Sequence, residues 1–530
     1  MKNLFIITGV PGAGKTTYLA KQAAAAAKKH GSDTVWIASL TKTAAAEIAG
    51  RDVPIPKEQV GTLHSHAYRA LGTSNLMQTS DGLKDWNQWI DEKKLGSLYS
   101  LSLDKTADID DMSNEIGTGG AGDKVFEEYN LLRNRMIDRS LWPKRALAFA
   151  AQWEEWKADR SGIDFSDMIE LALTEDVYLP AETGIFDEVQ DFSALELALV
   201  MKWAERMEFV VLAGDSDQTL FCFRGAEARN IYGLPVDEAN KRFLLKSYRC
   251  PRAVVAYANR VISQCKEREN IFMQPKDADG EFRRSPASIW EPEIAVSDAR
   301  QYLEAGKSVA FLTTAGYMLD SLIGDLRANG IPYENRFRRK NHTWNPLFCA
   351  NGVSAKDRLL MFTEGGEGWS NDDVYNWSLE FEAGKTMTRG AKTEIEKARK
   401  EPFSLSKMRE WFAPCWPEPL RFNPDWYIEQ MLASKKAKYK YPLTIMRKRG
   451  KAALSLTPQI TVGTIHSVKG ATFDAVYIFP DISPSCYDEC HYSVEGRNSA
   501  YRTWYVGASR AAESLIVCEP CTEFVTPFEG

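Results

Sequence analysis

Apolar runs and amphipathic stretches alternate from the start of the chain. Residues 3–9 (NLFIITG) form a short apolar run that ends in glycine, and the Ala-rich residues 15–31 that follow also end in glycine. A second apolar run at 34–40 (TVWIASL) precedes the helical pattern TKTAAAEIAG at 41–50. Strands that are apolar throughout and joined by helices are typical of a parallel sheet with helices on both faces.

The same alternation resumes after a helical stretch. Residues 81–94 and 145–160 have the periodicity of amphipathic helices, and strand-like runs return at 183–191 (TGIFDEVQD) and 208–215 (EFVVLAGD). A second group of strand-like segments follows, interrupted by a Trp- and Lys-rich stretch. These segments are 241–262, 307–316, 460–481 and 514–520.

The pattern therefore predicts an α/β fold with two parallel-sheet domains, each interrupted by a mainly helical subdomain. The first domain is expected at 1–72 and 183–235, with its insertion at 73–182. The second is expected at 236–341 and 456–530, with its insertion at 342–455.

Composition narrows the possible partners. The 530 residues carry a net charge of −6, so contact with nucleic acid needs a local basic groove rather than global charge. No apolar run is long enough for a signal peptide or a membrane span, which predicts a cytoplasmic protein without membrane contact. Nine cysteines fit reduced thiols better than a disulfide framework.

Four of these cysteines form two pairs that raise the question of zinc. Cys486 and Cys490 lie in CYDECH, and Cys518 and Cys521 lie in CEPC. Their spacing matches no common zinc module, so four unrelated thiols are favoured and zinc is left open.

The stretch GVPGAGKTT at 9–17 matches the phosphate-binding pattern G-x-x-x-x-G-K-[ST] in full, between a predicted strand and a predicted helix. Its glycines let backbone N–H groups converge on phosphate oxygens, Lys15 reaches the terminal phosphates, and Thr16 offers a hydroxyl to Mg²⁺. The predicted nucleotide-binding residues of this stretch are Gly9, Pro11, Gly12, Ala13, Gly14, Lys15, Thr16 and Thr17.

A pair of acids follows the apolar run at 183–186. Asp187 and Glu188 are expected at the carboxyl edge of the sheet, beside the phosphates. Asp187 suits a Mg²⁺ ligand, and Glu188 suits a base that deprotonates the attacking water.

The order of the motifs resembles that of the UvrD/Rep/PcrA group of superfamily 1 DNA helicases. Eight stretches match in order: GVPGAGKTT, ASLTKTAAAEI, GTLHSHAYRAL, IFDEVQD, AGDSDQTLFCFRGA, LLKSYRCP, VGTIHSVKGATFDAVYI and YVGASRA. The resemblance implies two RecA-like motor domains with ATP bound between them and single-stranded DNA across their tops. The two insertions match only loosely.

The resemblance also implies roles for individual residues. Gln218 would sense the γ-phosphate, Arg249 and Arg510 would stabilise charge on the transferring phosphoryl group, and Tyr248 would stack on adenine. Phe223 is the expected base-stacking residue, whereas Phe221 is expected in the core. The remaining implied DNA contacts are Thr41, Thr62, His64, Ser65, Arg224, Thr464, His466 and Lys469.

Three departures from the family pattern affect nucleotide recognition. The chain has no room before Gly9 for the family's adenine-reading segment, Thr17 stands where the family often has an arginine, and Thr472 replaces a ribose-binding glutamate. These changes predict relaxed nucleotide choice, with ATP as the main substrate and other nucleoside triphosphates accepted. Leu40 also replaces an aromatic residue that the family often stacks against a base.

The Lys-rich stretch 435–451 (KKAKYKYPLTIMRKRGK) leaves two alternatives, a solvated helix face or a DNA contact. The function expected from all these features is an ATP-dependent helicase that moves 3′→5′ on single-stranded DNA and at junctions with duplex. The alternatives are a translocase that strips proteins from DNA with little unwinding, and a non-catalytic recruiting subunit that keeps the motor fold. Pathway, protein partners and oligomeric state are not predicted.

Overall fold

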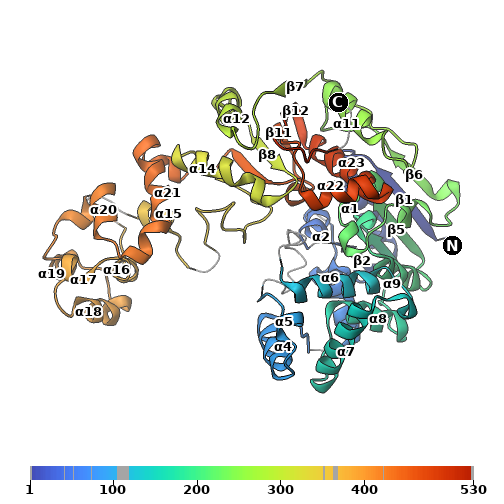
Figure 1. Cartoon of the computed structure of the whole chain (residues 1–530), viewed down its shortest axis with the longest axis horizontal. Coiled ribbons are helices and arrows are strands. Elements are labelled where there is room, and N and C mark those ends of the chain that lie inside the picture. The colour runs from blue at the N-terminus through green and yellow to red at the C-terminus, as the bar shows by residue number, and fades with distance from the viewer. Residues whose placement is uncertain are drawn as a thin grey trace.

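The computed structural model describes residues 3–40, 42–51, 53–72, 75–103, 119–349, 352–361, 368–421 and 423–526. Within them lie two six-stranded sheets, both parallel throughout (Figure 1). This confirms the predicted fold class.

The first sheet has the strand order β3-β2-β4-β5-β1-β6. Its strands are β1 (Leu4–Gly9), β2 (Val35–Ser39), β3 (Val60–Thr62), β4 (Thr183–Phe186), β5 (Phe209–Gly214) and β6 (Lys241–Leu244). The helices of this unit are α1 (Lys15–His30), α2 (Lys42–Ala49), α3 (Leu63–Leu71), α8 (Phe165–Thr174), α9 (Ala194–Ala204) and α10 (Arg229–Tyr232). Strands β1, β4 and β5 are central and almost wholly buried, which explains their continuous apolar character.

Strand β6 lies in a different sheet from the one we expected. We assigned residues 236–341 to the second domain, but β6 pairs with β1, with Ile6 opposite Lys241 and Gly9 opposite Leu244. Its partly exposed, basic side chains suit an edge strand. The pattern within a strand gives its burial but not its partner, so the sequence could not place this strand.

The second sheet has the order β7-β12-β11-β8-β10-β9. Its strands are β7 (Glu281–Ser285), β8 (Val309–Thr313), β9 (Tyr333–Glu334), β10 (Ile460–Thr464), β11 (Phe473–Ile478) and β12 (Ala511–Cys518). The helices of this unit are α11 (Arg252–Ile262), α12 (Pro292–Asp298), α13 (Arg300–Glu304), α14 (Asp320–Ala328), α22 (Pro484–Tyr492) and α23 (Val494–Ala508).

Each sheet carries a helical insertion, as the sequence predicts. The first contains α4 (Ser80–Glu92), α5 (Gly96–Tyr99), α6 (Ala121–Asn134) and α7 (Lys144–Asp159). The second contains α15 (Ala355–Leu360), α16 (Asn371–Ser378), α17 (Ala383–Thr386), α18 (Ala391–Lys397), α19 (Leu405–Trp411), α20 (Pro424–Gln430) and α21 (Ala433–Arg449). Figure 1 shows the second insertion projecting to the left of both sheets, whereas the first lies below them.

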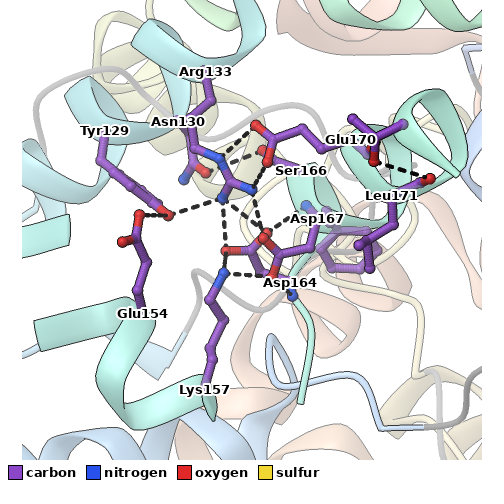
Figure 2. A network of polar contacts seen from close by, with 12 residues as sticks. Tyr129, Asn130, Arg133, Glu154, Lys157, Asp164, Ser166, Asp167, Glu170 and Leu171 are labelled. Atoms are coloured by element: carbon purple, nitrogen blue, oxygen red, sulfur yellow. Dashed lines mark hydrogen bonds and ion pairs between the residues drawn. The ribbon is translucent and has the colours of Figure 1, made fainter. Parts of the chain in front are cut away.

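A buried charge network ties the first insertion to the first sheet's unit (Figure 2). Asp164 caps α8 and accepts hydrogen bonds from Arg133 of α6 (2.9 Å) and Lys157 of α7 (2.6 Å). Burial alone would raise the pKa of the Asp164 carboxyl, but Arg133 and Lys157 hold it below its usual range. Since buried charges need partners, the network fixes three helices at one point.

Candidate nucleotide site and interface between the units

The predicted phosphate loop connects β1 to α1 in a tight turn. Gly12 and Gly14 have φ values of 72° and 79°, a region that favours glycine. A Cβ added to Gly12 would lie 2.6 Å from the Cβ of Arg249. Because Gly12 has no side chain, the segment that follows β6 can pack closely against the loop. The first turn of the 16-residue helix α1 borders a cavity between the two units. The N-terminus of a helix is suited to binding anions.

Lys15 and Tyr248 frame this loop. The Lys15 ammonium donates a hydrogen bond to the Gly9 carbonyl (2.8 Å), and the Tyr248 backbone N–H donates to the Gly12 carbonyl (2.9 Å). The Tyr248 side chain is 71% exposed and borders the same cavity, so one face of its ring is available to a planar ligand.

Asp187 and Glu188 stand directly after β4, where the sequence placed them. Burial, followed by the neighbouring Glu188, raises the pKa of the Asp187 carboxyl to about 7. Burial also acts to raise the pKa of Glu188, but the Lys469 and Lys15 ammonium groups outweigh it and lower the pKa to about 2. The two adjacent acids therefore differ in proton affinity, and the Glu188 carboxylate is stabilised in its charged form by the neighbouring ammonium groups.

Gln218 joins the two units. Its side-chain N–H donates to Asp215 at the end of β5 (2.7 Å), and its carbonyl oxygen accepts from the Arg510 guanidinium (3.2 Å). Arg510 follows α23, so one amide side chain connects a strand end of the first sheet with a cation of the second unit.

Arg249 and Arg510 are two cations close together. Arg249 donates to the carbonyls of Ser509 (3.2 Å) and Gly470 (3.4 Å). Burial, followed by repulsion from Arg249, lowers the pKa of Arg510 to about 9. Such a pair is electrostatically prepared for an anion, because added negative charge would relieve the repulsion.

These groups surround one cavity of about 940 Å³ between the units. Of the predicted residues it brings together Pro11, Gly12, Ala13, Gly14, Lys15, Thr16, Thr17, Asp187, Glu188, Gln218, Tyr248, Arg249 and Arg510. Gly9 is held next to it through Lys15. The Thr16 hydroxyl and Asp187 carboxylate are hard oxygen donors at this cavity, so the residues present fit Mg²⁺.

Sequence reasoning missed several cations that border the cavity. Arg51 donates to the Thr17 hydroxyl (2.8 Å), and Lys276 donates to the Ala512 carbonyl (2.7 Å). Residues 336–340 (RFRRK), after β9, also border it. The basic run at 336–340 could have been recognised in the sequence as a candidate anion-binding segment. Nothing in the sequence indicated that Arg51 would contact Thr17.

The predicted DNA contacts Thr62 and Ser65 form a turn at the end of β3. The Ser65 N–H donates to the Thr62 hydroxyl (3.2 Å), and the Ser65 hydroxyl donates to the Thr62 carbonyl (2.8 Å). His64 is buried beside Glu196, with 3.6 Å between Nδ1 and Oε1, and burial lowers its pKa to about 4. The side chains of Thr62, His64 and Ser65 thus already have polar contacts within the first unit. Thr41 lies outside the described residues.

The second sheet repeats this turn at the end of β10. The Ser467 N–H donates to the Thr464 hydroxyl (3.2 Å). His466 is half-buried and lies 6.3 Å from Phe221 and 6.5 Å from Phe223, measured between ring centroids. Phe221 is 3% exposed whereas Phe223 and Arg224 are partly exposed, an arrangement that agrees with Phe223 as the accessible ring of the pair.

Lys469, which is predicted to contact DNA, borders the nucleotide cavity in this structure. Its ammonium forms ion pairs with Asp191 and Glu188. A linear motif could not show these ion pairs, because Asp191 and Glu188 belong to the other unit.

The basic run 435–451 is helical over most of its length, in α21. Tyr439 is fully buried and Tyr441 is 7% exposed, with its hydroxyl donating to the Ile331 carbonyl (2.7 Å). Lys438 donates to Glu380 (2.7 Å). Because the tyrosines pack inward, the stretch lacks the exposed aromatic rings of a strand contact, and this favours the solvated helix face.

The cysteine pairs do not converge on a metal site. Among the described residues, the only three His, Cys, Asp or Glu ligand atoms within 4.8 Å of one another belong to His30, Glu182 and Glu208. None of the described helices is long and apolar enough to cross a membrane.

Comparisons with known proteins match the part of the chain that contains the phosphate loop and other regions. A family model described as an AAA domain matches residues 1–224. "Putative ATP-dependent DNA helicase YjcD" of Bacillus subtilis is 24% identical over 62% of this chain and 46% of its own length. The ATP-dependent DNA helicase PcrA of Staphylococcus aureus is 24% identical over 42% of this chain and 30% of its own length.

A third relative, "Probable DNA helicase II homolog" of Mycoplasma pneumoniae, is 24% identical over 53% of this chain and 42% of its own length. The match to this chain thus spans less than half the length of each of the three relatives. The chain carries an AAA domain at residues 1–224 and is a distant homologue of the UvrD/PcrA family of superfamily 1 DNA helicases.

Proposed function

We propose that this protein is an ATP-dependent DNA helicase that moves on single-stranded DNA by coupling nucleotide hydrolysis to closure of its two sheet units. The observation that carries the proposal is the cavity itself, because groups of both units border it and Gln218 connects them through Arg510. A ligand bound there changes its charge on hydrolysis and thereby changes the attraction between the units.

The proposed roles follow from the contacts. Lys15 and the N-terminus of α1 hold the β- and γ-phosphates, and Glu188 removes a proton from the attacking water. Arg249 and Arg510 stabilise negative charge on the phosphoryl group, which their mutual repulsion favours. Mg²⁺, when bound by Thr16 and Asp187, supplies charge neutralisation at the phosphates.

The strand path is proposed along the two matching turns and Phe223. Thr62, His64 and Ser65 on one unit and Thr464 and His466 on the other are the proposed backbone contacts. Phe223 with Arg224 provides a stacking surface whose interaction is tolerant of base sequence. Movement in the 3′→5′ direction and action at single-strand–duplex junctions are part of the proposal, supported by the resemblance to the helicase family.

Relaxed nucleotide choice is also proposed. Tyr248 and Arg51 flank the loop side of the cavity, and a ring face and a guanidinium recognise a base with little discrimination between purines. We expect GTP and dATP to be hydrolysed within about tenfold of ATP, because the discrimination that the remaining contacts supply is about 1 kcal/mol. Strict dependence on ATP in steady-state rates would contradict this.

The decisive experiment measures nucleotide hydrolysis with and without single-stranded oligothymidylate, for the wild type and Glu188→Gln. We expect strong stimulation by the strand and a loss of about 100-fold or more in the variant. Forked substrates with 3′ or 5′ tails then test polarity. No hydrolysis by the wild type, with or without the strand, would favour the recruiting-subunit alternative.

A further inference from the structure

The wall that the second unit contributes to the cavity is rich in cations. Besides the groups assigned to the 5′-phosphates, Lys276 and the segment 336–340 (RFRRK) line the same space. The carboxylates that line the cavity all belong to the first unit: Glu47, Asp187, Glu188 and Asp191. Among the described lining residues, the second unit therefore offers positive charge without a carboxylate of its own to neutralise it, and such a wall attracts further anions.

The segment 336–340 follows β9 and is fixed at its start. Asn335 donates hydrogen bonds to the Val462 carbonyl (3.1 Å) and to the Ser467 hydroxyl (3.0 Å). The Phe337 ring lies 6.3 Å from the Phe473 ring, measured between centroids. Phe473 directly follows Thr472, which lines the cavity with a neutral side chain. The basic segment is thus held beside the Thr472 part of the cavity wall.

Two arginines of this segment stack on aromatic rings. The Arg336 guanidinium carbon lies 5.0 Å from the centre of the Phe337 ring, and that of Arg339 lies 5.9 Å from the centre of the Phe348 ring. Both arginines are exposed, and neither forms an ion pair with a carboxylate among the residues that the structure describes. Because stacking uses the face of a guanidinium, its in-plane N–H groups stay available, and their fork geometry matches a phosphate.

The segment borders the nucleotide cavity rather than the proposed strand path. The strand contacts proposed on the second unit, Thr464 and His466, are not among the described residues that line the cavity, whereas residues 336–340 are. Burial, Lys469 and Arg338 together lower the pKa of His466 to about 4, so the segment also lies near the strand path. A strand phosphate is therefore the alternative occupant.

The cavity has room for a ligand with more than one group of phosphates. Its volume of about 940 Å³ is at the upper end of the range of about 300–1,000 Å³ that is usual for small-molecule sites. In the proposed function Lys15 holds the 5′-phosphates and Tyr248 contacts the base, so the ribose lies between them. The ribose hydroxyls are then the points from which a further phosphate can extend to the remaining wall.

We propose that the cavity binds nucleotides that carry a further phosphate on a ribose hydroxyl, and that Arg336 and Arg339 bind this phosphate. The inference rests on the proposed nucleotide site and adds a class of ligand to it. Such a nucleotide with only a diphosphate at its 5′ position occupies the site without supplying a γ-phosphate. It therefore competes with ATP and stops hydrolysis.

The first experiment measures, by calorimetry on the whole chain, the binding of ADP and of its 3′- and 2′-phosphorylated forms. At least one phosphorylated form should bind about tenfold or more tightly than ADP, because hydrogen bonds to charged groups are among the strong ones. This preference should weaken as the salt concentration rises, because both arginines are exposed. Equal affinities of the three ligands would overturn the inference.

Substitution of the two arginines locates the further phosphate. In R336Q/R339Q the ratio of the two affinities should fall close to one, whereas R336K/R339K, which keeps the charges but loses the forks, should retain part of the preference. If the double glutamine variant is unstable in thermal unfolding, Arg339→Gln alone should still lower the ratio. R389Q/R409Q is the matched control, because it removes two exposed arginines of the second insertion that do not line the cavity. It should leave the ratio at its wild-type value.

The outcomes separate this inference from the proposed function. If R336Q/R339Q keeps the preference for the phosphorylated form and instead weakens the binding of oligothymidylate, the arginines serve the strand and the inference is wrong. If the wild type binds ADP but shows no preference for either phosphorylated form, the inference is also wrong and the nucleotide site stands. If none of the three ligands binds, the proposed function itself fails.

Discussion

The same six-residue pattern, VGTxHS, ends a strand in each sheet and has two different environments. Residues 60–65 (VGTLHS) contain β3 and the turn after it, and residues 462–467 (VGTIHS) contain the end of β10 and the turn after it. In both, the serine hydroxyl donates to the carbonyl of the threonine that ends the strand, three residues earlier. His64 then faces a carboxylate of its own unit, whereas His466 faces the aromatic rings of the other unit. The local sequence fixes the turn, and the surroundings fix its role.

The two histidines should make stability sensitive to acid to the same degree despite their different surroundings, and this is the largest expected effect. Burial is the main reason that the pKa of each is lowered to about 4. At His64 the Glu196 carboxylate opposes this shift and Arg224 adds to it, whereas at His466 Lys469 and Arg338 both add to it. Because the folded pKa lies below the ordinary value of 6.5, the unfolded state binds more protons between these values, so stability is complete above pH 6.5 and lost as the pH falls toward 4.

We therefore expect His466→Gln to recover up to about 2–3 kcal/mol of that loss, measured as the difference in urea unfolding between pH 7 and pH 4.5. His64→Gln should recover a similar amount, because its pKa is lowered to the same value with the attraction of Glu196 included. A clearly smaller recovery in one variant would show that the two sites differ in how they bear a protonated histidine.

The second-largest effect on stability is expected when the glycine before each turn is replaced by alanine. A Cβ on Gly61 would lie 2.5 Å from the Ser65 hydroxyl, and one on Gly463 would lie 2.4 Å from both the Ser467 hydroxyl and the Asn335 amide. We expect Gly463→Ala to cost about 2–3 kcal/mol and Gly61→Ala about 1–2 kcal/mol, because Asn335 is itself fixed by a hydrogen bond to the Val462 carbonyl. Denaturant midpoints measure both, and a larger cost at Gly61 would contradict the ranking.

The threonine hydroxyls should contribute a smaller and nearly equal amount. Thr62 and Thr464 each accept one backbone N–H at 3.2 Å. Replacing either by valine should cost about 1 kcal/mol in unfolding free energy. A much greater loss of oligothymidylate affinity than of stability in either variant would show that the hydroxyl contacts the strand, as proposed.

The smallest effect is expected outside the turns, in α21. Replacing Lys435, Lys436 and Lys440 with alanine should leave the salt dependence of strand binding unchanged, because Tyr439 and Tyr441 in the same helix are buried and offer no ring to a strand. Since exposed charges contribute little, stability should change by less than about 0.5 kcal/mol per residue. A flatter salt dependence would restore the alternative of a strand contact.

The sequence by itself determined the elements whose signal is local. Continuous apolar runs predicted the central strands, and the glycines before Lys15 predicted the phosphate loop, in which two of them have positive φ. Both features depend on residues that are adjacent in the chain. The position of Asp187 and Glu188 after β4 followed for the same reason.

Only the tertiary structure decided which residues meet across the two units. It placed β6 beside β1, brought Arg51 to Thr17 and brought Lys469 to Glu188 and Asp191. Sheet partners and ion pairs depend on which surfaces pack together, and an ammonium goes to the nearest buried carboxylate whatever motif carries it.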